Sequence, residues 1–295
     1  MSGFMHVRKR KERYMRKSAD GIFNNLIIIR GAGDLATAVA IRLHNSGFRV
    51  VCLEVAKPTV IRRTVSFAQA VFEGQSCVEN VHARLVSIED IEKTFSEDAV
   101  PVLIDPEADA IRILKPSVLI DAIIAKKNLG TSKDMAPFTI AMGPGFIAGE
   151  DVDCVVETAR GHNLARLIYS GSAAPNTGIP GNIEGFSSER VIHSPCSGTF
   201  HTIREIGDIV SKGEVIAKVG SMPVHATIDG MIRGLLHDGL DIPEHFKIAD
   251  IDPRGSRADY LTCSDKARAL GGAVLEAVMN YLSGRYNSKA KQSIQ

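Results

Sequence analysis

The stretch LIIIRGAGDLATAVAIRL, residues 26–43, decides the fold of the N-terminal part of this 295-residue chain. An apolar strand runs directly into a glycine-rich turn, and apolar residues at helical spacing follow the turn. In such a unit one glycine permits the tight turn, a second admits a pyrophosphate to the backbone, and a small third residue lets the helix pack on the strand. The stretch predicts an α/β fold with a Rossmann-like parallel sheet. Its candidate cofactor-binding residues are Gly31, Gly33, Asp34 and Ala36.

An acidic residue, Glu54, ends the next apolar run, VVCLE. It lies about 20 residues after the glycine turn, where the acid of a dinucleotide site receives the ribose hydroxyls and opposes a 2′-phosphate. Glu54 is therefore a candidate contact for NAD or another adenosine without that phosphate. A Rossmann-shaped scaffold whose turn binds nothing is the alternative. Arg62 and Arg63 follow on a segment without a predicted place in the fold; we expect them at the surface, with contact to a phosphate as the alternative.

Further apolar runs alternate with helical patterns up to about Leu167, which predicts parallel strands joined by crossover helices. Two of these runs read VLID and end at Asp105 and Asp121. Because the carboxyl ends of parallel strands face the ligand crevice, both carboxylates are expected there. Asp105 precedes Pro106, and this pair favours a structural role at a helix start. Asp121 is a candidate cofactor contact, with a structural role as the alternative.

Two polar clusters follow later strands of the same sheet. Gly143 and Gly145 flank a proline directly after the strand FTIAM, where glycines make room for a ligand near backbone N–H groups. Glu157, Arg160 and His162 follow the strand CVV; a guanidinium suits phosphate, and an imidazole titrates near neutrality. All five are candidate cofactor-binding residues. For His162 a structural role is the alternative.

Beyond a segment rich in glycine and proline, the chain contains an internal repeat. Residues 198–219 and 230–251 align without a gap, so that turn glycines and apolar positions coincide. Two β-rich copies predict a small all-β barrel-sandwich module. Its GDIVSKGEVIAKV segment is similar to biotinyl and lipoyl domains, but the hairpin at 219–224 lacks the lysine that a swinging-arm carrier needs. We therefore expect a structural or docking module.

The sequence thus divides into five segments. They are a basic disordered tail, a Rossmann-like nucleotide-binding domain, a functional loop or linker, the barrel-sandwich module, and a C-terminal segment whose helix packs on the first domain: residues 1–20, 21–170, 171–190, 191–255 and 256–295. The C-terminal helix is expected to begin at Ser264 as N-cap and to end at Leu282.

Composition restricts the partners and the compartment. The 35 Lys and Arg residues balance 34 Asp and Glu residues, so charge gives no bias toward nucleic acid. The basic cluster within residues 1–20 is interpreted as a solvated tail rather than a nucleic-acid arm. Apolar runs are far shorter than the roughly 20 residues of a membrane span, and we expect no membrane partner. Five scattered cysteines without CxxC spacing predict reduced thiols in the cytoplasm and no metal site.

Several motifs occur in an order that resembles a known family. They are IIIRGAGDLATAVAIRLHNSGFRVVCLE, RRTVSFAQAVFEG, LIDAIIAKKNLGT, MGPGFIAGEDVDCVVETARGH, NTGIPG and DIDPRG. Together, over residues 25–283, they resemble the selenium-dependent molybdenum hydroxylase accessory proteins of the YqeB type. The resemblance implies a role in maturing a molybdenum hydroxylase with labile selenium, related in idea to the XdhC proteins. The resemblance also implies that the hydroxylase is the partner of this protein and that a molybdopterin-type cofactor is its ligand.

Three hypotheses follow. The first is an accessory protein that binds a nucleotide-bearing small molecule, such as molybdopterin dinucleotide or NAD. The second is an NAD-dependent oxidoreductase that uses the same turn and Glu54. A hydride-transferring enzyme needs a proton donor beside the hydride acceptor, and the sequence indicates none, so the catalytic residues are unassigned. The third is a non-catalytic scaffold that docks the hydroxylase through its β module.

Overall fold

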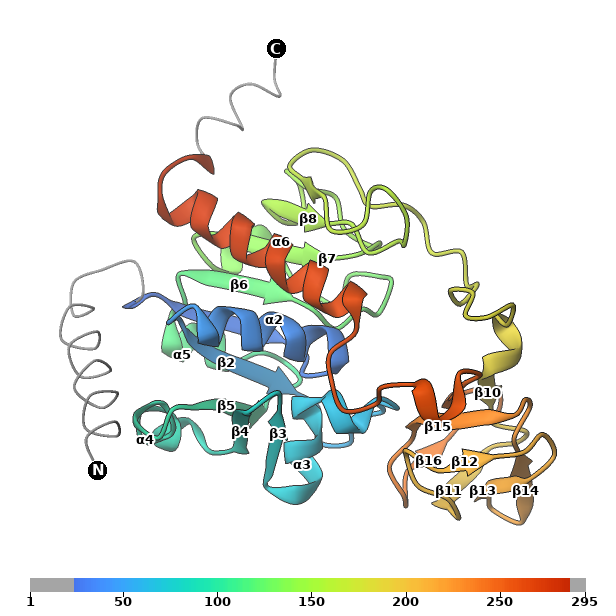
Figure 1. The fold of residues 1–295 in the computed structure, drawn as a ribbon. Helices are drawn as coiled ribbons and strands as arrows, with labels where there is room; N and C mark the ends of the chain where they lie inside the picture. The colour runs from blue at the N-terminus through green and yellow to red at the C-terminus, as the bar shows by residue number, and fades with distance from the viewer. Residues whose placement is uncertain (1–23, 287–295) are drawn as a thin grey trace, which may run out of the picture.

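The computed structural model describes residues 24–286 of the chain (Figure 1). Their N-terminal part forms an α/β domain around one nine-stranded sheet, ordered β3-β4-β5-β2-β1-β6-β7-β8-β9. The strands are β1 (Leu26–Arg30), β2 (Arg49–Glu54), β3 (Gln75–Val78), β4 (Val81–Leu85), β5 (Ala99–Ile104), β6 (Val118–Asp121), β7 (Thr139–Met142), β8 (Cys154–Val156) and β9 (Leu167–Ile168). Only the edge pairs β3–β4 and β8–β9 are antiparallel. The predicted α/β class and mostly parallel sheet are confirmed, whereas the predicted tail at 1–20 lies outside the described residues.

The strand order changes direction at β1. Strands β2, β5 and β4 follow on one side, and β6, β7 and β8 on the other. Ile29 of β1 pairs with Cys52 of β2 and with Ile120 of β6, and all three side chains are buried. Strands covered on both faces need almost continuous apolar runs, which is what these segments contain. In open parallel sheets, ligand crevices form where the order reverses, outside the carboxyl ends of the strands.

Two helices lie side by side on one face of the sheet (Figure 1). They are α2 (Asp34–Asn45), which follows the glycine turn, and α6 (Asp265–Leu282), which comes from the other end of the chain. Their contact is close because Gly271 of α6 faces the carbonyl of Ala38, where a Cβ atom would lie 2.9 Å from the oxygen. The helix expected from Ser264 is α6, and the Ser264 hydroxyl caps it.

The opposite face carries shorter helices. They are α4 (Ile91–Ser96) and α5 (Ala110–Leu114), while α3 (Ala70–Glu73) leads into β3. The prediction of crossover helices was wrong for part of the sheet: in the described chain, the β6–β7 and β7–β8 connections contain no α-helix. Helix α6 packs over β7 and β8 instead, so that face is already covered.

Residues 191–252 form a β module of two antiparallel sheets, ordered β10-β17-β15-β12 and β14-β13-β11-β16. The strands are β10 (Val191–His193), β11 (Gly198–Thr202), β12 (Ile209–Val210), β13 (Val215–Val219), β14 (Met222–His225), β15 (Gly230–Leu235), β16 (Asp241–Ile242) and β17 (Lys247–Asp252). The predicted repeat is visible here, since β11, β12 and β13 begin at the same positions of the first copy as β15, β16 and β17 do of the second. The equivalent residues Ile216 and Ile248 share one buried core. The hairpin of β13 and β14 turns at Gly220 and Ser221.

A segment after β2 joins the β module to the α/β domain. The carbonyl of Ile61 accepts a hydrogen bond from the Leu235 N–H at 2.8 Å, and Arg63 Nε donates to the Leu235 carbonyl at 2.8 Å. The rings of Phe72 and His237 stack with centroids 3.8 Å apart. This docking places β15 and β17 beside the beginnings of α2 and α6. No helix within residues 24–286 combines the length and apolar character needed to cross a membrane.

Candidate functional site

A basic cleft lies between the beginnings of α2 and α6 and the strands β15 and β17. Its inner cavity has a volume of about 320 Å³ and is lined by six cations and two carboxylates, Asp34 and Asp250. The cations are Arg62, Arg160, Arg190, Arg233, Lys247 and Lys266. Two further cavities, of about 560 and 690 Å³, share Arg160 with it. We call the three cavities together the basic cleft. Its excess of positive charge suits an anionic ligand.

The first turn of α2 brings backbone N–H groups to the cleft. Gly33 is the N-cap in an extended conformation, with φ −65° and ψ 179°, and offers no side chain to cap the helix. Asp34 and Leu35 line the inner cavity. Because the N–H groups of a first turn lack intrahelical acceptors and lie at the positive end of the helix dipole, they favour an anion. Of the predicted ligand contacts, Asp34 therefore lines the cleft, and Gly33 directly precedes it in the chain.

Arg62 is the most unusual side chain of the cleft. It is only 8% exposed, and its Nε and Nη2 atoms have no hydrogen-bond partner among the described residues. A buried, unsatisfied donor is destabilising, and an anion that accepts from the guanidinium would remove that penalty. The expectation that Arg62 and Arg63 lie at the surface was wrong, because the β module docks on this segment and covers both.

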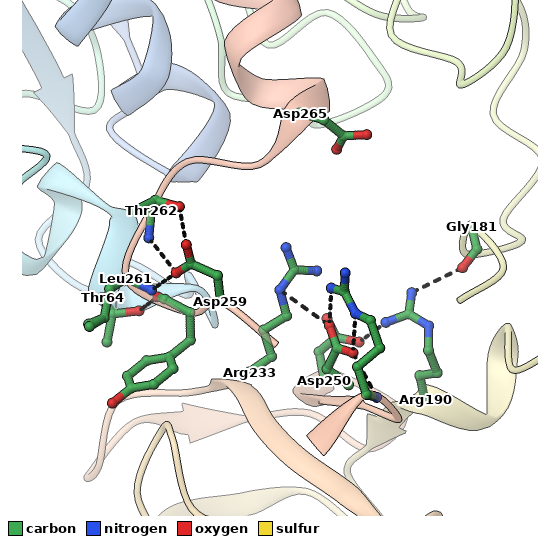
Figure 2. Close-up of polar contacts among 12 residues, drawn as sticks. Thr64, Gly181, Arg190, Arg233, Asp250, Asp259, Leu261, Thr262 and Asp265 are labelled. Atoms are coloured by element: carbon green, nitrogen blue, oxygen red, sulfur yellow. Dashed lines mark hydrogen bonds and ion pairs between the residues drawn. The ribbon is translucent and has the colours of Figure 1, made fainter. Parts of the chain in front are cut away.

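Two aspartates of β17 organise the arginines of the β module. Asp250 accepts from Arg190 at 2.6 Å, and the fully buried Asp252 accepts from Arg254 at 2.6 and 2.9 Å. Arg233 Nε lies farther from the Asp252 carboxylate, at 3.8 Å. Figure 2 shows Arg233 and Arg190 on either side of the carboxylates of β17, with Arg233 directed toward the beginning of α6. Asp250 is thus paired with Arg190, whereas Asp252 is shared by Arg254 and, at the longer distance, Arg233.

Three cations of the cleft are disfavoured in their charged form. Burial, followed by repulsion from Arg62, lowers the pKa of the Arg233 guanidinium. Burial, followed by repulsion from Arg160, lowers the pKa of the Lys266 ammonium. Burial also lowers the pKa of the Lys247 ammonium. All three effects would be offset by a bound anion, since opposite charge favours the protonated forms.

Arg160 lines all three cavities and pairs with Asp265 through two hydrogen bonds of 2.9 and 3.0 Å. This pairing lowers the pKa of Asp265 to about 2. Because that value is below the unfolded one, the pair stabilises the fold above about pH 4 and this contribution is lost as the pH falls toward 2. Both side chains are at least half exposed, so we expect less than about 1 kcal/mol.

The substitution Arg160→Gln is expected to return the pKa of Asp265 toward about 3.9, because the charged partner is lost. An NMR titration of the side-chain carboxyl carbon would measure this change, with Arg112→Gln on α5 as the control. An unchanged pKa would mean that the backbone N–H of Lys266, which also donates to Asp265, holds the carboxylate by itself.

The glycine turn itself is engaged by its own chain. Gly31 has φ +96°, and a Cβ atom there would lie 3.0 Å from the Ala122 carbonyl oxygen. The carboxylate of Glu54 accepts from the Ala32 and Val55 N–H groups, each at 2.8 Å, and burial raises its pKa. Glu54 therefore holds the turn in place, and its oxygens are already used by backbone donors.

Two further predicted residues have structural surroundings. Asp121 is buried and accepts from the Thr131 hydroxyl at 2.6 Å, and Arg30 donates to the same hydroxyl at 2.6 Å. Burial raises the pKa of Asp121. Ala36 is completely buried in the core between α2 and the sheet. Neither residue lines the basic cleft.

The second group of predicted residues supports loops. Gly143 has φ +83° and faces the Thr158 hydroxyl, and Gly145 has φ +107° and faces the backbone of Lys127, where a Cβ atom would lie 2.6 Å away. Glu157 is buried and accepts from the N–H groups of Ala159 and Ala174 at 2.6 and 2.7 Å. At Gly143 and Gly145, therefore, atoms of Thr158 and Lys127 occupy the space that the absence of a Cβ atom leaves.

His162 is exposed and lies 3.2 Å from Arg166, outside the lining of the cleft. Among residues 24–286, no three His, Cys, Asp or Glu side chains are grouped so that they could hold a metal ion. Of the eleven predicted site residues, the structure thus brings Asp34 and Arg160 together in the lining of the cleft, with Gly33 beside it as the N-cap of α2. Sequence reasoning did not identify four of the cations that line the inner cavity: Arg190, Arg233, Lys247 and Lys266.

Comparison with known proteins adds one informative similarity. No protein-family model matches the chain. Over 266 residues, 90% of its length, the chain is 53% identical to the uncharacterized protein YqeB of Escherichia coli K12. The chain is a homologue of YqeB. It spans about half the length of that relative, 49%.

The similarity to YqeB is too long to be confined to one part of the chain, so it takes in both the α/β domain and the β module.

Solved structures are more distant. An aspartoacylase family protein of Mesorhizobium loti is 13% identical, with 77% of this chain and 84% of that chain covered and a TM-score of 0.24. For the ectoine utilization protein EutE (DoeB) of Ruegeria pomeroyi the identity is 11%, the coverage 77% and 85%, and the TM-score 0.24. Scores this low bear on neither the fold nor the function of the chain.

Proposed function

We propose that this chain binds a nucleotide-bearing ligand in the basic cleft and acts as an accessory protein in the maturation of a selenium-dependent molybdenum hydroxylase. The observation that carries the binding part is Arg62, a buried side chain whose Nε and Nη2 atoms have no hydrogen-bond partner among the described residues, beside the uncapped beginning of α2. A phosphate-bearing ligand would satisfy both groups together.

The strand order supports this proposal. The six strands β5-β2-β1-β6-β7-β8 follow the order of a doubly wound dinucleotide-binding fold, with the reversal at β1. On this basis we assign the α/β domain as Rossmann-like. The two symmetric sheets support a barrel-sandwich assignment for the β module, which would serve as the docking surface for the hydroxylase.

The maturation role rests on the sequence motifs shared with proteins of the YqeB type, and the XdhC relation rests on the same motifs. Molybdopterin dinucleotide and NAD are the candidate ligands, because both carry phosphate groups that suit the cleft. The scattered cysteines support a cytoplasmic location. Native mass spectrometry of protein purified without oxygen would test the proposal first: a bound mass of the molybdopterin type supports it, and a nicotinamide dinucleotide favours the oxidoreductase.

The substitution Gly33→Val is expected to weaken nucleotide binding at least about tenfold while the protein stays folded. The backbone of Gly33 suits any residue, and its added Cβ would meet only the Val60 side chain, at 3.4 Å. The new side chain would, however, cover the N–H groups of the first turn of α2. Isothermal titration calorimetry with NAD and with molybdopterin dinucleotide measures the change. Gly272→Val, on an open part of α6, is the matched control.

If Gly33→Val folds and binds both nucleotides with unchanged affinity, the beginning of α2 is not the binding site. The role of a docking scaffold would then fit better. Deletion of the β module should in that case abolish co-purification with the hydroxylase.

A further inference from the structure

The six cations of the inner cavity come from both parts of the chain. Arg62, Arg160 and Lys266 belong to the α/β domain and its helix α6. The other three belong to the β module or the turn that leads into it: Arg190, Arg233 and Lys247. Because neither part holds the whole set, the cavity is complete only when the two parts are docked.

Three of these cations have no ion-pair partner among the described residues, and a fourth, Arg233, shares Asp252 with Arg254. Arg190 is paired with Asp250 at 2.6 Å, and Arg160 with Asp265 at 2.9 Å. The remaining cations are Arg62, Arg233, Lys247 and Lys266, against one remaining carboxylate of the lining, Asp34. The balance is three positive charges. A phosphate monoester carries its about 1.5 to 2 negative charges on one phosphate, whereas a diphosphate group places charge on two adjacent phosphates and so can meet cations from both sides of the cavity.

Geometry agrees with the charges. Arg62 lies next to Ile61, whose carbonyl is bonded to Leu235 at the seam between the two parts. An anion bound to the free Nε and Nη2 atoms of Arg62 therefore sits at that seam. The neighbouring cavities of about 560 and 690 Å³ leave room for the rest of an ester. Arginine forks and a helix beginning together are suited to adjacent phosphate groups.

We infer that the basic cleft is a clamp for a diphosphate group, with one set of cations supplied by the α/β domain and the other by the β module. The ligand then bridges the two parts and stabilises their docking. This inference deepens the proposed function, because it names the chemical group that the cleft recognises. It relies on that function only for the remainder of the ligand.

The test uses the full chain and two probes, inorganic pyrophosphate and inorganic phosphate, titrated calorimetrically at constant ionic strength. We expect pyrophosphate to bind at least about tenfold more tightly than phosphate, since it contacts more cations. Lys247→Gln in the β module and Lys266→Gln in α6 should each weaken pyrophosphate binding about tenfold. Lys218→Gln, an exposed lysine on β13 outside the cleft, is the matched control and should change nothing.

Two results would overturn the inference. Equal affinity for phosphate and pyrophosphate would exclude recognition of a diphosphate. Loss of affinity in Lys266→Gln with none in Lys247→Gln would exclude a clamp shared by the two parts. Melting temperatures equal to that of the unaltered protein would confirm that both variants are folded.

The outcomes also separate this inference from the proposed function. If pyrophosphate binds as expected but no nucleotide binds more tightly than pyrophosphate, the clamp stands and nucleotide recognition fails. If a nucleotide binds, is not displaced by pyrophosphate and is unaffected by Lys247→Gln, nucleotide recognition stands and the clamp fails.

Discussion

Replacing Gly230 with alanine is expected to lower the free energy of unfolding of the β module by about 3 to 5 kcal/mol. Gly230 begins β15 with φ +155°, and a Cβ atom there would lie 2.3 Å from the carbonyl oxygen of Asp252. The oxygen belongs to the paired strand β17 and cannot move without opening the ladder. Differential scanning calorimetry of the full chain would show the β module melting at a lower temperature.

The internal repeat provides the control for this experiment. Gly198, the equivalent glycine of the first copy, has nearly the same φ of +157°, but its Cβ atom would meet nothing closer than the Gly220 nitrogen at 3.3 Å. Gly198→Ala should therefore cost about 1 to 2 kcal/mol, mainly from backbone strain. The difference between the two variants isolates the steric contact. Equal losses would mean that the positive φ, and not the Asp252 carbonyl, explains why both positions are glycine.

Arg62→Met is expected to stabilise the unliganded protein by about 1 to 3 kcal/mol and to abolish binding of pyrophosphate. Methionine fills a similar volume, and the apolar neighbours Leu35, Val60 and Ile61 suit it. Burial, and after it repulsion from Arg62, lowers the pKa of Arg233, and the substitution removes the second of these causes. A gain in stability together with a loss of binding is expected when a residue serves ligand binding at a cost to the stability of the unliganded protein.

Chemical denaturation and calorimetric titration of the same preparation would measure both effects of Arg62→Met. Arg112→Met, whose side chain is 89% exposed on α5, is the control and should alter neither. A loss of stability in Arg62→Met without ligand would contradict the interpretation, because it would mean that the guanidinium already has a stabilising partner in the fold.

Local patterns predicted the first part of the sheet because its signals lie within a few residues of one another. The strand β1, the turn at Gly31 and the helix α2 fall inside or directly beside the quoted stretch 26–43. The Asp-Pro signal was also informative, since Asp105 accepts from the N–H groups of Asp109 and Ala110 at the start of α5. The helix nevertheless begins several residues later than the proline suggested.

The basic cleft could not be predicted in the same way. Its cations are spread from Arg62 to Lys266 and meet only because the β module docks on the segment after β2. The glycine clusters predicted ligand contacts that the structure does not show. A glycine that makes room for a ligand and a glycine that makes room for another part of the chain look the same in the sequence. Gly145 is the clearest example, since the backbone of Lys127 occupies its open side. One local signal was available: Arg233 interrupts the otherwise apolar strand β15, as a buried functional cation would.

The two copies of the repeat use equivalent turns differently. The turn at Gly220 and Ser221 is exposed and is held by a hydrogen bond from the Gly220 N–H to the Thr199 carbonyl, whereas its counterpart in the second copy contains Asp252 and leads to Arg254 of the cleft. A repeat places two turns of the same shape in one module. One of them can therefore carry the residues of a site while the sequence of the other is free to vary. For the experimenter, the unused copy is an attachment point: a fluorophore or affinity tag at Ser221 leaves the arginines of the second turn untouched.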